Sequence, residues 1–121
     1  MIKIKEVAFF VYAVTDIKKS RAFYEGILGL KPGADFPVSD DSKWIEYDIN
    51  GVTLAIGQSE QWLPSSDGAT AGLEVEDFAA AVAHLKENGV QFSLEASDFP
   101  SCSMAVVFDP DKNKVCIHKR K

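Results

Sequence analysis

Cysteine and histidine are scarce in this chain of 121 residues, which has two of each. Cys102 and Cys116 lie far apart and form no CxxC pair. For such cysteine usage a reduced, cytoplasmic protein is the default expectation.

Long apolar runs are also missing, since the longest extends only from Val7 to Val14, which is too short to cross a bilayer. Ile2, Lys3, Ile4 and Lys5 alternate where a signal peptide needs an apolar stretch, so no secretory signal is predicted.

Positive charge is in deficit, because 13 Lys and Arg face 18 Asp and Glu and leave a net charge of −5. The basic residues form only one short run, at 119–121, which is typical of a solvated tail. Neither nucleic acid nor an anionic membrane is therefore expected as a partner.

The first half of the chain predicts a β-α-β-β-β order. Asp16, or Thr15 before it, offers an N-cap for a helix, and Asn50-Gly51 is a strong signal for a two-residue hairpin turn. The expected strands are 4–14, 30–36, 42–49 and 52–57, and the expected helix is 17–26.

A polar stretch over 59–68 predicts a linker, after which the same order returns. Asp77 is expected to cap an alanine-rich helix that Gly89 ends. The expected strands are 69–75, 90–95, 103–108 and 114–118, and the expected helix is 78–88.

The two halves are related by an offset of 61 residues. Asp16 and Asp77 each follow an apolar strand and open a helix at this offset, and Gly29 falls within one residue of Gly89. An internal duplication of this kind predicts two similar units that each need a partner to bury a sheet face.

Several motifs resemble those of the vicinal oxygen chelate superfamily, the group of glyoxalases, bleomycin-resistance proteins and extradiol dioxygenases. They are Val14-Thr15-Asp16, Arg21-Ala22-Phe23-Tyr24, Leu28-Gly29-Leu30 and Asp109-Pro110-Asp111. The resemblance implies an α+β fold in which two βαβββ modules form a curved mixed sheet around a cleft, with the helices on its convex side. It predicts one domain over 1–121, with modules at about 1–58 and 69–121, and a homodimer.

In enzymes of this superfamily four side chains, usually His, Glu or Gln, hold one divalent metal. The corresponding positions here are Phe9, Thr70, Cys116 and a fourth near Ala55, with Gln58 as the alternative. Phe and Ala cannot ligate, Thr is a poor ligand, and one thiolate is not a site. The resemblance therefore predicts a member without the usual metal and without another cofactor.

Strand alternation predicts what lines the cleft instead. A two-residue Asn-Gly loop pairs Glu46 with Ala55, and cross-strand partners share a face. The predicted ligand-binding residues are Phe9, Val11, Trp44, Glu46, Ala55, Thr70, Glu74, Cys116 and His118.

Each polar member of that set also has a structural interpretation. Glu46 and Glu74 are equally compatible with solvated strand edges. For His118 a surface position is favoured, and for Cys116 a small buried side chain is favoured over a reactive thiol. Trp62, in the linker, is either a lid over the cleft or a packing anchor between modules.

Three functions remain open at this point. The first is a protein that binds a small organic molecule without metal, with no nucleic acid or membrane partner. The second is a glyoxalase-like lyase, isomerase or dioxygenase-related enzyme that uses Glu46, Glu74 and His118 as acid/base residues, or an atypical metal site. The third is a subunit that serves only assembly.

Overall fold

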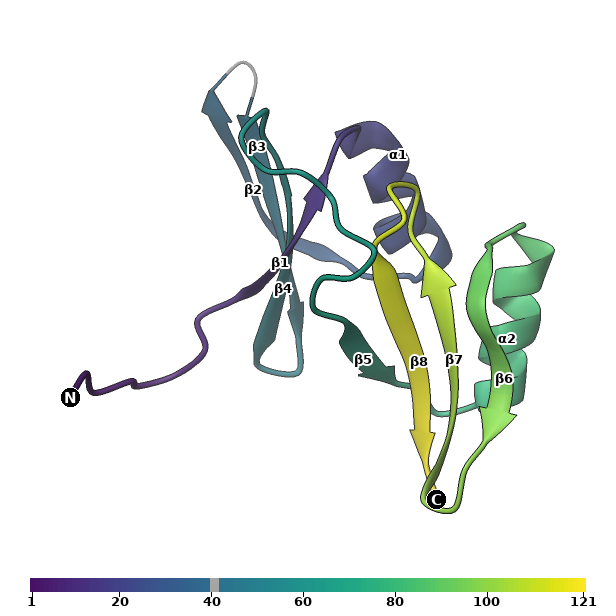
Figure 1. The fold of residues 1–121 in the computed structure, drawn as a ribbon. Helices are drawn as coiled ribbons and strands as arrows, with labels where there is room; N and C mark the ends of the chain where they lie inside the picture. Colours follow the sequence, from purple (N-terminus) through teal and green to yellow (C-terminus); the bar gives the residue numbers. More distant parts are fainter. Residues whose placement is uncertain (40–41) are drawn as a thin grey trace. The chain divides into compact units, whose positions relative to one another are not determined.

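The computed structural model describes residues 1–39 and 42–121 and divides them into two compact units (Figure 1). Unit 1 comprises Met1–Leu63 and unit 2 comprises Pro64–Lys121. Each unit has its own four-stranded sheet and its own helical segment. We describe each unit by itself.

Unit 1 contains a mixed sheet in which only one strand pair is parallel. Its strand order is β1-β4-β3-β2, with β1 parallel to β4 and the other pairs antiparallel. The helix α1 continues directly into a π-helical segment, η1. The elements are β1 (Phe10–Val14), α1 (Ile17–Arg21), η1 (Ala22–Ile27), β2 (Pro32–Ser39), β3 (Ser42–Ile49) and β4 (Val52–Gln58).

Unit 2 repeats this topology, with strand order β5-β8-β7-β6 and a parallel β5–β8 pair. Its elements are β5 (Ala71–Glu74), α2 (Phe78–Glu87), β6 (Phe92–Asp98), β7 (Cys102–Phe108) and β8 (Lys114–Arg120). The two equivalent βαβββ units confirm the α+β fold and the duplication that the sequence predicted.

Both helices begin at the predicted aspartates. The Asp16 carboxylate accepts hydrogen bonds from the backbone N–H groups of Lys18 and Lys19, and Asp77 accepts one from Ala80. These bonds satisfy amides that have no partner inside the helix. The chain leaves both helical segments through a glycine in the left-handed region, Gly29 with φ 78° and Gly89 with φ 70°.

The first hairpin has the predicted register. Asn50 (φ 50°) and Gly51 (φ 85°) both adopt positive φ, as a type I′ turn requires. Ile49 pairs with Val52, and Glu46 therefore pairs with Ala55. The prediction of which residues share each face of this hairpin is thus confirmed.

Each sheet packs one face against its own helix. In unit 1 that face is aromatic, because Tyr24 of η1 lies between Tyr12 and Tyr47, with ring centroids 6.0 and 6.3 Å away. In unit 2 the corresponding core is aliphatic, and its buried members are Leu85, Ala105, Val107, Val115 and Ile117. The other face of each sheet is free of its own helix.

Some boundaries differ from the sequence prediction. The first strand begins at Phe10, not at residue 4. Phe10 pairs with Leu54, and β4 begins only two residues earlier, at Val52, so the residues well before Phe10 have no strand beside them to pair with. The second strand begins at Pro32, not at residue 30, and as an edge strand it accommodates this proline with a shift in register. Thr70 lies just before β5 and is exposed, so its predicted place on a strand was wrong.

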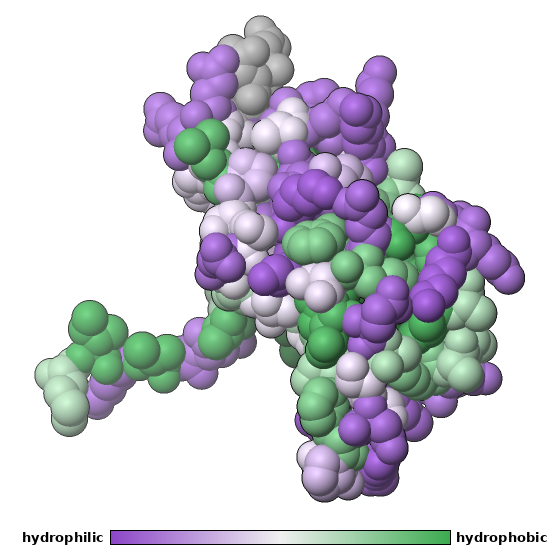
Figure 2. Space-filling model, turned by 45° about the vertical axis from the view of Figure 1, so that its right-hand side comes forward, coloured by the Kyte–Doolittle hydropathy of each residue, from purple (hydrophilic) through white to green (hydrophobic). Residues whose placement is uncertain are grey.

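The first nine residues have no regular structure and expose apolar side chains between charged ones. This segment is the thin extended arm of Figure 2, where apolar surface alternates with polar surface. No helix in the described part of the chain is long and apolar enough to cross a membrane.

Candidate functional site

Three aromatic residues meet on the face of the unit 1 sheet that turns away from the helix. The Phe9 and Trp44 rings stand edge to face, with centroids 5.0 Å apart, and Trp44 contacts Trp62 at 5.8 Å. We call Phe9, Trp44 and Trp62 the aromatic cluster. Phe9 remains 46% exposed and Trp62 45% exposed, so two of the three rings present a large apolar surface to solvent.

A glycine makes the approach of Trp62 possible. The chain turns after β4 through a hydrogen bond from the Trp62 N–H to the Ser59 carbonyl, which brings the indole back over the sheet. A Cβ on Gly57 would lie 3.1 Å from Trp62 Cζ3 and 3.3 Å from Trp44 Cε3. Both indoles therefore pack closely against a backbone position that has no side chain.

One carboxylate belongs to this surface. Glu46 is half-buried, and its Oε2 accepts a 2.8 Å hydrogen bond from the Trp44 indole Nε1–H. Its cross-strand neighbour Ala55 is fully buried. Val11 on β1 pairs with Ala55, so it belongs to the same part of the sheet.

The equivalent face of unit 2 carries a carboxylate–imidazole pair. Glu74 and His118 are register partners in the parallel β5–β8 ladder, and Glu74 Oε1 lies 2.6 Å from His118 Nδ1. The second carboxylate oxygen accepts the Arg120 backbone N–H at 2.7 Å. These hydrogen bonds lower the pKa of Glu74, the one from Arg120 most, so Glu74 is held as a carboxylate that orients the imidazole.

Cys116 lies two ladder positions from this pair, opposite Gly72. Its Sγ contacts the Met104 sulfur at 3.8 Å, and burial raises the pKa of the thiol. A half-buried thiol of this kind is a poor nucleophile, because the thiolate is the reactive form.

The residues at the superfamily's metal positions do not fit a divalent ion. Phe9 packs on Trp44, Ala55 is buried without a donor atom, and the Gln58 Oε1 accepts the backbone N–H of Ile17 at the start of α1. Within residues 1–39 and 42–121, no three His, Cys, Asp or Glu side chains are grouped so that they could hold a metal.

The predicted binding residues thus fall into two sets, one on each unit. Phe9, Val11, Trp44, Glu46 and Ala55 come together in unit 1, and Glu74, Cys116 and His118 come together in unit 2. A cleft between the modules stays a prediction. Trp62 packs within unit 1 against Trp44.

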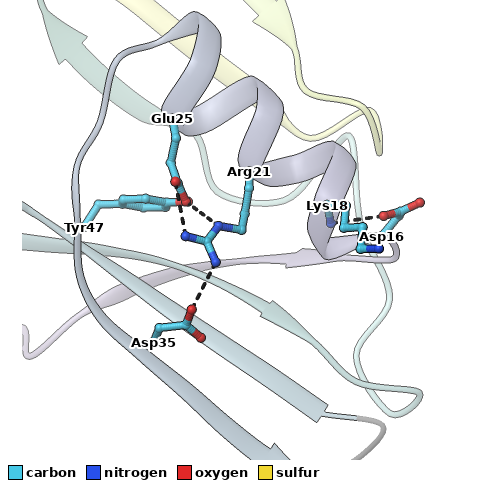
Figure 3. A network of polar contacts seen from close by, with 6 residues as sticks. All are labelled: Asp16, Lys18, Arg21, Glu25, Asp35 and Tyr47. Carbon is cyan, nitrogen blue, oxygen red and sulfur yellow. Dashed lines mark hydrogen bonds and ion pairs between the residues drawn. The ribbon is translucent and has the colours of Figure 1, made fainter.

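Sequence reasoning missed a polar network on the helical side of unit 1 (Figure 3). Arg21 donates to both carboxylate oxygens of Glu25, at 2.7 and 3.3 Å, and to Asp35 at 3.0 Å. Tyr47, which is fully buried, donates its hydroxyl to Glu25 at 2.9 Å. The i,i+4 spacing of Arg21 and Glu25 was a usable signal for the ion pair, but nothing local indicated Tyr47 or Asp35.

Comparison with protein families gives a match over nearly the whole chain. The model for the Glyoxalase/Bleomycin resistance protein/Dioxygenase superfamily matches residues 6–117. Among curated proteins, none matches this chain.

Solved structures share the fold along the full length. The Streptomyces sp. CB03234 protein TnmS3, an antibiotic binding protein, superposes with a TM-score of 0.82 at 24% identity and with 100% of both chains covered. A glyoxalase/bleomycin resistance protein from the same organism has a TM-score of 0.75 at 25% identity, covering 93% of this chain and 98% of its own. A glyoxalase family protein from Enterococcus faecalis has a TM-score of 0.73 at 23% identity, covering 94% and 97%.

Proposed function

This chain belongs to the Glyoxalase/Bleomycin resistance protein/Dioxygenase superfamily, and from that premise we propose that it binds a small organic molecule on the aromatic face of unit 1, without the superfamily's divalent metal. The observation that carries the proposal is the aromatic cluster, with two half-exposed rings beside a carboxylate. Aromatic rings supply large contact areas at small entropic cost, and one polar group suffices to orient a ligand.

The fold offers a precedent for this kind of ligand. TnmS3 is an antibiotic binding protein, and its structure has the same fold over its full length. The proposal for this chain rests on its own residues, because a likeness at this level of identity extends to the fold alone.

A thermal-shift screen of a metabolite and antibiotic library tests the proposal. Phe9→Ala should weaken the binding of the hits by about tenfold, roughly 1.4 kcal/mol, because it removes a contact surface. Phe99→Ala is the matched control, since Phe99 lies in unit 2 and is 40% exposed, close to the 46% of Phe9. Hits that bind equally well to both variants would place the ligand elsewhere and contradict the proposal.

Metal content is measured on the same preparations. With Phe9 and Ala55 at two of the four positions, elemental analysis of protein purified without chelators should find no stoichiometric divalent ion. One equivalent of zinc, nickel, iron or manganese, removed by a chelator together with ligand binding, would be incompatible with a metal-free site.

A second candidate function is proton transfer next to a carbonyl group, and the 2.6 Å contact between Glu74 and His118 favours it. Because Glu74 occupies Nδ1, the exchanging atom would be Nε2 of His118, and Glu74 would be a positioning residue. Incubation of carbonyl-containing hits in D2O distinguishes the two functions. Loss of the α-proton signal with wild type but not with His118→Gln would identify an enzyme, and its retention with both would leave a binding protein.

We also propose, from the resemblance, that the protein works as a cytoplasmic homodimer and that its two units form one domain. Both cysteines are free thiols in the described structure, which agrees with a reducing compartment.

A further inference from the structure

We propose that the ligand of the aromatic cluster is an organic cation, such as a protonated or alkylated amine, and that Glu46 is its counter-ion. This inference rests on the proposed function, because it names the class of molecule that the aromatic face takes. It starts from the surroundings of a single carboxylate.

Glu46 is a half-buried carboxylate whose bonding partner is a neutral group. The Trp44 indole N–H occupies its Oε2. Among the described residues of unit 1, no lysine or arginine lies within ion-pair distance of Glu46, and the two residues outside the description are Asp40 and Asp41, which carry no positive charge. A carboxylate that is partly removed from water loses favourable hydration. The attraction of a cationic partner offsets this loss.

A second half-buried carboxylate among the described residues of unit 1 shows how such a charge is usually matched. Glu25, on the helical side, receives two hydrogen bonds from Arg21 and one from Tyr47. Its charge is thus matched within the chain. Glu46, on the opposite face of the sheet, has no such match inside unit 1, so its counter-ion is free to come from a ligand.

The aromatic cluster favours the same charge. The face of an aromatic ring carries partial negative charge and attracts cations, and alkyl groups on an ammonium fit against such faces. Both exposed rings, Phe9 and Trp62, pack edge to face on Trp44, and the Trp44 indole itself is hydrogen-bonded to the Glu46 carboxylate. The Trp44 N–H is already used by Glu46, so the cluster offers an anion no indole donor from Trp44. Asp48, exposed two residues along β3 on the same face, adds a second negative charge.

A pair of isosteric probes isolates the charge. Choline and its neutral carbon analogue 3,3-dimethylbutan-1-ol have nearly the same shape, and neither absorbs where tryptophan is excited. The chain has two tryptophans, Trp44 and Trp62, and both belong to the aromatic cluster, so intrinsic fluorescence reports on this surface. We expect choline to change the emission at a concentration at least about tenfold lower than its neutral analogue.

Two carboxylate-to-amide variants complete the experiment. Glu46→Gln keeps an acceptor for the Trp44 N–H but removes the charge, and it should bring choline to the affinity of the neutral analogue without changing that of the analogue. Asp48→Asn makes the same change at an exposed position of the same strand and should leave most of the preference for choline. Without ligand, the Glu46→Gln variant should melt at an equal or higher temperature, because it loses an unmatched charge.

The outcomes separate this inference from the proposed function. If both probes bind equally, or if Glu46→Gln leaves the preference for choline intact, Glu46 is not the counter-ion of a cationic ligand and the inference is wrong. The inference also fails if neither probe changes the emission. In each of these cases, neutral or anionic hits from the library that depend on Phe9 would still support binding on the aromatic face.

Discussion

At the scale of single residues, Gly57 determines how the aromatic cluster is built. Its missing side chain lets two indoles approach the β4 backbone, and an added methyl group would lie 3.1 Å from the nearer one. A contact this short forces one of the rings to move. The exposed apolar surface thus depends on a residue that has no side chain of its own.

Gly57→Ala should therefore destabilise the protein by about 1–3 kcal/mol and change the tryptophan emission, because overpacking displaces Trp62. Gly72→Ala is the matched control, since Gly72 also lies in a strand and a Cβ there meets no atom within 4 Å. Urea unfolding followed by fluorescence measures both. Equal stability of the two variants would mean that Trp62 does not pack on Gly57.

Tyr47 is the residue through which the polar network of Figure 3 reaches the core. Burial first, and then its hydrogen bond to the Glu25 carboxylate, raise the pKa of Tyr47 well above its ordinary value near 10. Both effects disfavour the phenolate in the folded protein. The unfolded chain therefore releases this proton at a lower pH than the folded protein does.

When the pKa of an acid is higher in the folded than in the unfolded protein, stability does not change with pH as long as both states keep the proton. It falls once the pH is high enough for the unfolded chain to lose its proton first. The contribution of Tyr47 is complete below about pH 10 and is lost as the pH rises further, by about 1.4 kcal/mol per pH unit. Tyr47→Phe should cost about 1–2 kcal/mol at neutral pH, through the lost hydrogen bond, but should lose less stability than wild type above pH 10. Parallel curves of unfolding free energy against pH for the two proteins would show that Tyr47 titrates normally.

At the scale of elements, the two helices test the duplication. Asp16 accepts hydrogen bonds from two backbone amides and Asp77 from one. Both aspartates are therefore N-caps, and Asp16 satisfies one more amide than Asp77 does. Gln58 adds a further bond to the start of α1 by accepting the Ile17 N–H.

Asp16→Ala and Asp77→Ala should each lower the unfolding free energy by about 1 kcal/mol, with the larger loss at Asp16. Denaturant unfolding of the two single variants measures this, and Asp48→Ala serves as a control for removing an exposed aspartate outside the helices. A negligible loss at either position would mean that the sequence-equivalent aspartates do not have equivalent roles.

The sequence was informative about elements wherever the signal was local. Asn50-Gly51 determines the register of its hairpin and hence the partner of Glu46, and the two cap aspartates determine where the helices begin. The N-terminal strand was predicted too long. An alternation of apolar residues indicates only a preference for extended backbone, whereas a strand also needs a neighbouring strand to bond to, and β4 begins only at Val52. The packing of Trp62 on Trp44 depends on a turn that brings back a residue outside the strand, and strand alternation does not reach such a residue.

At the scale of the whole molecule, the exposed apolar arm at the N-terminus agrees with the proposed homodimer. Ile2 is 90% exposed, and Ile4 and Val7 are also largely exposed, in a segment whose alternating pattern is typical of a strand. Apolar side chains in such number are more often covered than left in water. Sedimentation at micromolar concentration should show a species of twice the monomer mass, whereas a single species of monomer mass would contradict the homodimer.

The central claim is that an organic molecule binds on the aromatic face of unit 1. A crystal structure of the protein with its tightest-binding hit tests it most directly, because density locates the ligand without any assumption about the register of strands. We expect density in contact with the rings of Phe9 and Trp62 and within hydrogen-bond distance of the Glu46 carboxylate. Ligand density that contacts none of these three residues would contradict the account, and so would rings that pack together over this face while the ligand binds elsewhere.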